Sequence, residues 1–150
     1  MTMKFLFPIL FLALAACSGK PEILIVKQFT LRDQETNKAG DPMIQNERLR
    51  RLHGAVSIEE RKQRLGQYYT VLWNADADAK KVIVFSYRQA SSGSRIKEMC
   101  RSLPIGEMQG KEEFTIIGDN YFDNGRVLAW KLDLTANGKT IASKRSYLWE

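Results

Sequence analysis

The order of hydrophobic and polar positions divides the chain after residue 21 into a strand, a helical stretch and a longer β-rich region. Residues 22–32 contain closely spaced β-branched and aromatic side chains and predict a first strand. Residues 33–40 are polar and predict a loop. Residues 67–150 alternate between apolar and polar side chains over several short runs, which is typical of half-buried strands. We therefore expect about six strands, with the helical stretch inserted after the first.

Two short helices are predicted in that stretch. Asp41 can cap the first helix, near residues 42–53, because its carboxylate accepts a hydrogen bond from an otherwise unpaired backbone N–H. The second, near residues 58–65, begins with a capping box in which Ser57 and Glu60 satisfy each other's backbone N–H groups. Both helices have a narrow apolar stripe, so we expect them to lie on the surface of a sheet rather than to form a bundle.

Turn residues in the β-rich region indicate how its strands connect. Residues 67–75 and 80–90 are separated by a short Asp-rich turn and predict an antiparallel hairpin. Residues 124–125 and 137–138 are Asn-Gly pairs, which favour two-residue turns because both central positions need positive φ. These two pairs predict a three-stranded meander at the C-terminal end.

Antiparallel pairing, short turns and aromatic alternation favour a mainly β fold, an antiparallel immunoglobulin-like β-sandwich with the two helices inserted after the first strand. Residues 67–150 resemble an immunoglobulin or fibronectin III type module at the level of this pattern. The alternative is an α+β fold, in which a single curved antiparallel sheet packs on the two helices. In the strand over residues 126–135, one face should carry Leu128, Trp130, Leu132 and Leu134.

The N-terminal segment is apolar and short. A basic head, an uncharged run over residues 5–16 and small residues at its end describe a secretory signal, and the run is shorter than the roughly 20 residues that span a bilayer. Residues 14–17, Leu-Ala-Ala-Cys, resemble the lipobox of bacterial lipoproteins. The resemblance implies cleavage before Cys17, a diacylglycerol on its sulfur and an acyl chain on its new amine. An ordinary cleaved signal is the alternative.

The lipobox predicts three parts for the chain. Residues 1–16 would be the cleaved signal peptide, residues 17–22 a lipidated tether and residues 23–150 a single β-rich domain. Removal of 16 from the 150 residues leaves 134, which is enough for one hydrophobic core. Ser18 follows the cysteine where inner-membrane lipoproteins often carry Asp. The resemblance therefore places the protein in the cell envelope and favours the outer membrane over the inner membrane.

The chain has a modest excess of positive charge, which limits the classes of binding partner that we expect. The chain has 23 Lys and Arg against 17 Asp and Glu, a formal net charge of +6. Besides the membrane that holds the lipid, we expect an envelope protein or an anionic polysaccharide as partner, and no nucleic acid. The predicted binding surface combines the basic residues of the helices with two tyrosines expected to be exposed: Arg48, Arg50, Arg51, Arg61, Lys62, Arg64, Tyr69 and Tyr87.

Residues typical of catalytic and metal sites are few. His53 is the only histidine, and Cys100 has no partner if Cys17 carries lipid, so a His or Cys metal site and a disulfide framework are disfavoured. We predict that Cys100 is a small buried side chain and that His53 has a structural role at the end of its helix. Acidic residues over 76–78 and 119–124 are explained by turns rather than by calcium binding. No cofactor is expected beyond the acyl groups on Cys17.

These patterns predict a membrane-anchored envelope lipoprotein that acts as a non-catalytic binding or structural module. The sequence contains neither a Gly-x-Ser-x-Gly motif nor a phosphate-binding glycine loop. The alternative is an enzyme or enzyme inhibitor that acts on cell-wall material. A pocket that combines His53 or Cys100 with convergent polar groups would favour the alternative.

Overall fold

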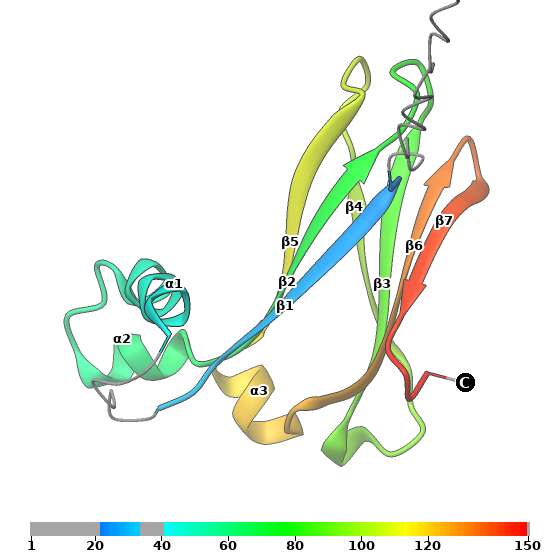
Figure 1. Ribbon diagram of the computed structural model, residues 1–150. Coiled ribbons are helices and arrows are strands. Elements are labelled where there is room, and N and C mark those ends of the chain that lie inside the picture. The colour runs from blue at the N-terminus through cyan, green and yellow to red at the C-terminus, as the bar shows by residue number, and fades with distance from the viewer. Residues whose placement is uncertain (1–21, 34–40, 150) are drawn as a thin grey trace, which may run out of the picture.

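Two antiparallel sheets face each other in the protein, for which a computed structural model describes residues 22–33 and 41–149 (Figure 1). Over these residues one sheet has three strands and the other has four. The predicted mainly β fold, an antiparallel β-sandwich, is confirmed, with both helices inserted after the first strand. The single curved sheet is excluded. The predicted signal peptide, Cys17 and the loop over residues 34–40 lie outside the described residues.

The two sheets have a simple strand order. The three-stranded sheet has the order β1-β2-β5 and consists of β1 (Leu24–Leu31), β2 (Gly66–Asn74) and β5 (Gln109–Ile117). The four-stranded sheet has the order β4-β3-β6-β7 and consists of β3 (Lys81–Gln89), β4 (Lys97–Ser102), β6 (Val127–Ala136) and β7 (Lys139–Arg145). The fourth strand thus belongs to the second sheet, whereas in a constant-type immunoglobulin domain it joins the first.

Two predicted connections are wrong because strands that follow each other in the sequence lie in opposite sheets. β2 and β3 face each other across the core instead of forming a hairpin, and β2 pairs with β1 and β5. β5 and β6 are also in different sheets, so the predicted meander is reduced to the β6–β7 hairpin. The first Asn-Gly pair ends a short helix, α3 (Asp119–Asn124), where a tight turn was expected. The second pair is confirmed, with φ of 51° at Asn137 and 78° at Gly138.

Strand β4 is missing from the sequence prediction because it is an edge strand with mostly exposed, polar side chains. Met99 packs against the core from this strand, and its neighbour Cys100 points the other way. The prediction that Cys100 is buried is therefore wrong: its thiol is free and exposed.

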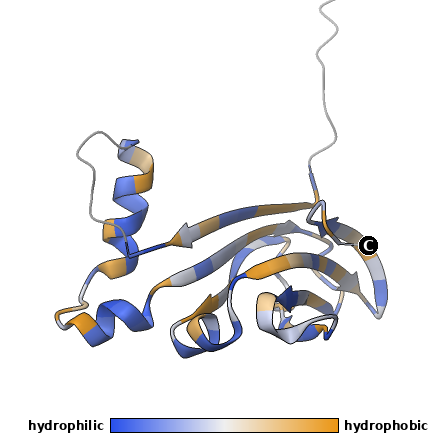
Figure 2. Ribbon diagram, turned by 90° about the horizontal axis from the view of Figure 1, so that it is seen from below, coloured by the Kyte–Doolittle hydropathy of each residue, from blue (hydrophilic) through white to orange (hydrophobic). Residues whose placement is uncertain are grey.

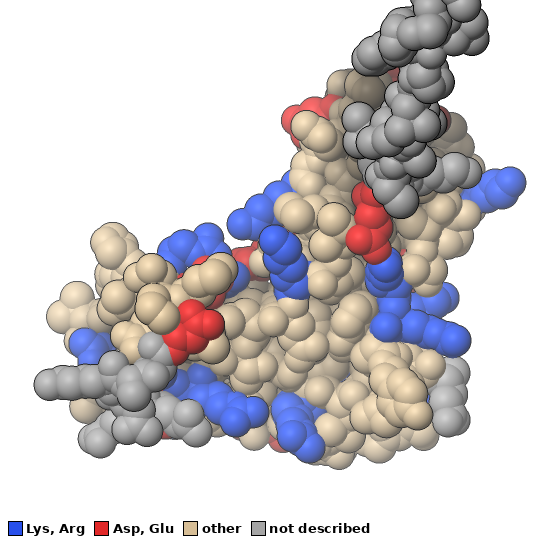
Figure 3. Space-filling model, viewed as in Figure 1, with Lys and Arg blue, Asp and Glu red and all other residues tan. Residues whose placement is uncertain are grey.

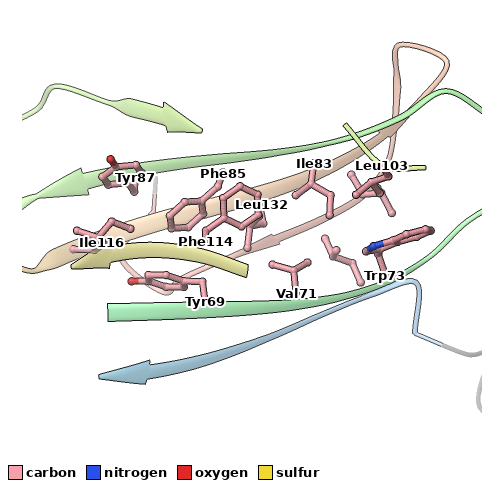
Figure 4. Packing of buried hydrophobic residues seen from close by; sticks show 13 residues of the cluster. Tyr69, Val71, Trp73, Ile83, Phe85, Tyr87, Leu103, Phe114, Ile116 and Leu132 are labelled. Atoms are coloured by element: carbon pink, nitrogen blue, oxygen red, sulfur yellow. The ribbon is translucent and has the colours of Figure 1, made fainter. Parts of the chain in front are cut away.

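Aromatic side chains fill the space between the sheets (Figure 4). The ring of Phe85 lies 4.7 Å from that of Tyr69 and 5.2 Å from those of Tyr87 and Phe114. Tyr69 is 0% exposed and Tyr87 is 3% exposed, so the prediction that both face solvent is wrong. Side chains alternate along a strand, and it is the neighbouring Tyr68 that β2 directs to its outer face.

Near the start of strand β6, the alternation of core-facing and outward-facing side chains is interrupted. Leu128, which the alternation places on the inner face, is 42% exposed. Ala129 pairs with Arg88 and Val127 with Gln89, so the register shifts by one residue and Leu128 has no partner in β3. The bulge leaves Leu128 outside the ladder, and Val127 before it faces the core together with Leu132 and Leu134.

The predicted helices are confirmed as α1 (Pro42–Leu52) and α2 (Ile58–Gln63). The Asp41 carboxylate accepts a hydrogen bond of 2.8 Å from the Met43 N–H, and the Ser57–Glu60 capping box is complete. Figures 1 and 2 show both helices beside one end of the three-stranded sheet, outside the two layers. A 3-10 turn, η1 (Ala90–Ser92), contacts α3. Among the described helices, none is long and apolar enough to cross a bilayer.

Candidate functional site

The outer face of the three-stranded sheet, turned away from the core, carries both apolar and charged side chains. Strand register fixes its rows, which run from β1 through β2 to β5. The other sheet cannot cover this face, so its apolar side chains are covered by the helices or left open to solvent. Three successive rows are Ile25-Leu72-Lys111, Lys27-Thr70-Glu113 and Phe29-Tyr68-Thr115.

A small apolar cluster joins the helices to one end of this face. Leu52 ends α1 and Leu65 follows α2, so the cluster fixes the ends of both helices on the sheet. At this end the helices contact the sheet, but they stand beside its end rather than lying across its surface as expected. The buried members are Leu31, Leu65 and Tyr68, and Phe29, Leu52 and Ile117 pack against them.

Arg51 provides a second, polar connection between α1 and the sheet. Its guanidinium lies 3.9 Å from the centre of the Tyr68 ring. It also donates hydrogen bonds of 2.8 Å to Glu47 on α1 and 2.6 Å to Glu113 on β5. Only 7% of the Arg51 side chain is exposed. A planar guanidinium can stack on a ring and bind carboxylates along its edge at the same time, so this one side chain bridges helix and sheet.

The carboxylates around Arg51 are held in their charged form. Side-chain hydrogen bonds from Arg50 are the main reason that the pKa of Glu47 falls to about 2, and Arg51 adds to this against the opposing effect of burial. Burial acts to raise the pKa of Glu113, but the hydrogen bond and charge of Arg51, with a hydrogen bond from Thr70, lower it below its usual range. Both carboxylates are therefore ionised near neutral pH and balance the two arginines.

Next to this network, α1 and the outer sheet face form an open cleft of about 410 Å³. This volume lies within the range of small-molecule binding sites. Met43 and Ile44 line the helix side and are 79% and 58% exposed, which is unusual for large apolar side chains in adjacent positions. Figure 3 shows several Lys and Arg side chains around the hollow between the helices and the sheet. The sheet side of the cleft is lined by Lys27, Gln28, Phe29, Thr70, Leu72 and Lys111.

The six predicted basic residues of the helices do not form one surface. Arg51 is enclosed by its network, and Arg50 is the one of the six that lines the cleft. Arg48 and Arg64 donate hydrogen bonds to backbone carbonyls beside α1. Arg61 and Lys62 are exposed on α2. These contacts show that most of the basic residues position the helices.

The structure also reveals site residues that the sequence did not single out. Lys27 and Lys111 are far apart in the sequence and meet at the cleft only because β1 and β5 both pair with β2. The one local signal is a lysine inside the apolar run that predicts β1. Met43 and Ile44 give another signal, because two exposed apolar residues in the first turn of a helix suggest contact with something outside it.

The residues considered for chemistry are separated. His53 is the C-cap residue of α1 and is exposed, whereas Cys100 lies on β4 in the other sheet. Within residues 22–33 and 41–149, no three His, Cys, Asp or Glu side chains are grouped as a metal ion would require. The carboxylates of the predicted turns over 76–78 lie in the β2–β3 connection, and those over 119–124 lie in α3.

No family model matches the sequence, and no curated protein or solved structure shows significant similarity to it.

Proposed function

We propose that this protein is a lipid-anchored module of the bacterial cell envelope that binds a negatively charged envelope component without catalysis. The anchor rests on the lipobox-like residues 14–17, and Ser18 favours the outer membrane. The binding part rests on one observation: the open cleft between α1 and the three-stranded sheet combines exposed apolar walls with Lys27 and Lys111.

The two lysines support binding of an anion because no carboxylate of the described residues is in direct contact with them. Among the described residues, neither Lys27 nor Lys111 takes part in an ion pair. The carboxylates of Glu47 and Glu113 are already bound to arginines. A ligand with negative charge would therefore gain two cationic contacts without displacing an existing one.

The position of the cleft is compatible with a lipid anchor on Cys17. Strand β1 begins at Leu24, and the six residues from 17 to 22 extend at most about 20 Å. Figure 1 shows the start of β1 at the end of the sandwich opposite to α1 and α2. In an anchored protein, the cleft would thus face away from the membrane that holds the lipid, where envelope components can reach it.

The anchor is tested by comparing the full-length chain with its Cys17→Ala variant in a bacterial host. We expect the native chain to incorporate labelled palmitate and to sediment with membranes, and the variant to lose the label. An equal label in both chains would contradict lipidation at Cys17. The matched control is Cys100→Ala, which should retain both properties.

The cleft is tested by photo-crosslinking in living cells. A photoreactive residue at Met43, in the cleft wall, should give a discrete adduct that mass spectrometry can identify. The same residue at Tyr147, which is fully exposed and does not line the cleft, should give none. Equal adducts from both positions, or none from Met43, would contradict a binding role for the cleft.

A further inference from the structure

We infer that the ligand of the cleft is an anionic amphiphile with a single hydrocarbon chain. Its charged head lies between Lys27 and Lys111, and its chain lies between the sheet and α1. This inference deepens the proposed function by naming the ligand class, and it does not depend on the lipid anchor.

The position of the head follows from strand register. Lys27 lies opposite Thr70, and Lys111 lies opposite Leu72, so the two lysines flank β2 on its two sides and one row apart. The spacings within a sheet place their Cα atoms about 12 Å apart. Both side chains are long and flexible, so their ammonium groups can converge on one phosphate or carboxylate above β2.

The nearby carboxylates do not compete for these lysines. Glu113 accepts hydrogen bonds from Arg51 and Thr70, at 2.6 and 3.2 Å, and the charge of Lys111 only adds to the lowering of its pKa. Glu47 accepts from Arg50 and Arg51. The cleft therefore keeps a net positive charge at neutral pH, which attracts an anion.

The apolar side chains of the cleft define a path for the hydrocarbon chain of the ligand. Phe29 and Leu72 lie on the sheet side, and Met43 and Ile44 face them from the first turn of α1. Methionine adapts its shape to irregular apolar partners. A volume of about 410 Å³ is near the lower end of ligand-binding sites, so we assign one chain to it rather than two.

The same lining argues against an anionic polysaccharide as the ligand. A sugar polymer offers hydroxyl groups along its whole length and needs polar partners for them. Four of the ten lining side chains are large and apolar, and three of the six polar ones, Thr70, Glu47 and Arg50, already make hydrogen bonds within the protein. Apolar side chains that remain exposed in the free protein are better matched by a hydrocarbon chain.

The inference is tested with the full-length chain in the presence of phosphatidylcholine nanodiscs. The probe is a dodecyl phosphate analogue that carries a diazirine in its chain, and mass spectrometry locates its adducts. We expect adducts on peptides that contain Phe29, Met43 or Leu72. The double variant Lys27→Gln/Lys111→Gln should lower them about tenfold, the loss expected for two charge-assisted contacts.

Matched controls distinguish the contribution of the charged head group from that of the hydrocarbon chain. Lys80→Gln/Lys139→Gln removes two exposed lysines that do not line the cleft and should leave the adducts unchanged. Unlabelled dodecyl phosphate should compete and dodecyl maltoside should not, and dodecanoate shows whether a carboxylate replaces the phosphate. Equal competition by dodecyl maltoside, or an equal amount of adduct in Lys27→Gln/Lys111→Gln and in the native chain, would overturn the inference. If Met43 instead captures a protein or polysaccharide in cells, the proposed function stands and the amphiphile is wrong.

Discussion

The sandwich and the helical lobe, residues 41–65, are held in place by different forces. The sandwich has an interior of aromatic and aliphatic side chains, among which Tyr69, Phe85 and Ile83 are completely buried. Neither helix of the lobe contains a buried residue. The lobe is attached by one small apolar cluster, by the Arg51 network and by single hydrogen bonds, such as those from Arg48 to the Arg32 carbonyl and from Gln63 to Asp119. We conclude that many contacts specify the sandwich and a few specify the lobe, so the cleft wall can shift without unfolding the core.

The largest expected effect is in the sandwich core. Phe85→Ala removes the ring that contacts Tyr69, Tyr87 and Phe114, and we expect the free energy of unfolding to fall by about 3–5 kcal/mol. Denaturant unfolding measures it. The control is Phe122→Ala on α3, where the side chain is 45% exposed and the loss should stay below about 1 kcal/mol. Similar losses for both would refute a core centred on Phe85.

A smaller effect is expected at a buried charge within the sandwich. Lys81 is 1% exposed and donates hydrogen bonds to the carbonyls of Asp76, Ala77 and Glu107 at 2.7–3.1 Å. It thereby ties the β2–β3 and β4–β5 connections together. Lys81→Met keeps the apolar stem but leaves these carbonyls unpaired, and should cost about 2–3 kcal/mol.

Its neighbour Lys80 is the matched control, because it is exposed. Lys80→Met should change the free energy of unfolding by less than about 0.5 kcal/mol. If Lys81→Met also left the free energy of unfolding unchanged, the hydrogen bonds of Lys81 would not stabilise this end of the sandwich. Apolar packing alone would then hold it, in contrast to the lobe, which is held partly by polar contacts.

A substitution in the Arg51 network should loosen the lobe without loosening the sandwich. Arg51→Met removes the bridge between Glu47 and Glu113, and we expect a loss of about 1–2 kcal/mol because both carboxylates are partly solvated. Hydrogen exchange should become faster for α1 amides and stay slow for β2 and β3 amides. Arg50→Met is the control: that side chain is 57% exposed, so its effect should be near 0.5 kcal/mol. Uniformly faster exchange would show that lobe and core unfold together.

Signals that act over a few residues were readable from the sequence. Asp41, the Ser57–Glu60 capping box and Asn137-Gly138 each determine structure through hydrogen bonds or φ angles of adjacent residues. They located both helices and one hairpin correctly. The pairing of strands depends on contacts between distant segments, and the sequence pattern therefore misassigned the partners of β2 and β5.

The site was harder to predict than the fold. Tyr68 and Tyr69 are both aromatic, so alternation in β2 does not reveal which one faces the core. At Leu128, a bulge changes the face within a single strand. Lys27 and Lys111 become neighbours only through two strand pairings, and neither was part of the predicted surface. The lysines of the proposed site lie on the sheet, whereas the predicted surface placed its basic residues on the helices.

The smallest expected effect is a pH dependence confined to the lobe. The folded pKa values of Glu47 and Glu113 lie below the ordinary value of 4.5. Their contribution to stability is therefore complete above about pH 4.5 and is lost as the pH falls toward the folded pKa values, about 2 for Glu47. We expect hydrogen exchange of α1 amides to accelerate between about pH 5 and pH 3, relative to β3 amides and after correction for intrinsic rates. Glu47→Gln/Glu113→Gln should abolish this difference, since neither amide titrates. If α1 and β3 responded equally, the Arg51 network would not be the contact that distinguishes the lobe from the sandwich.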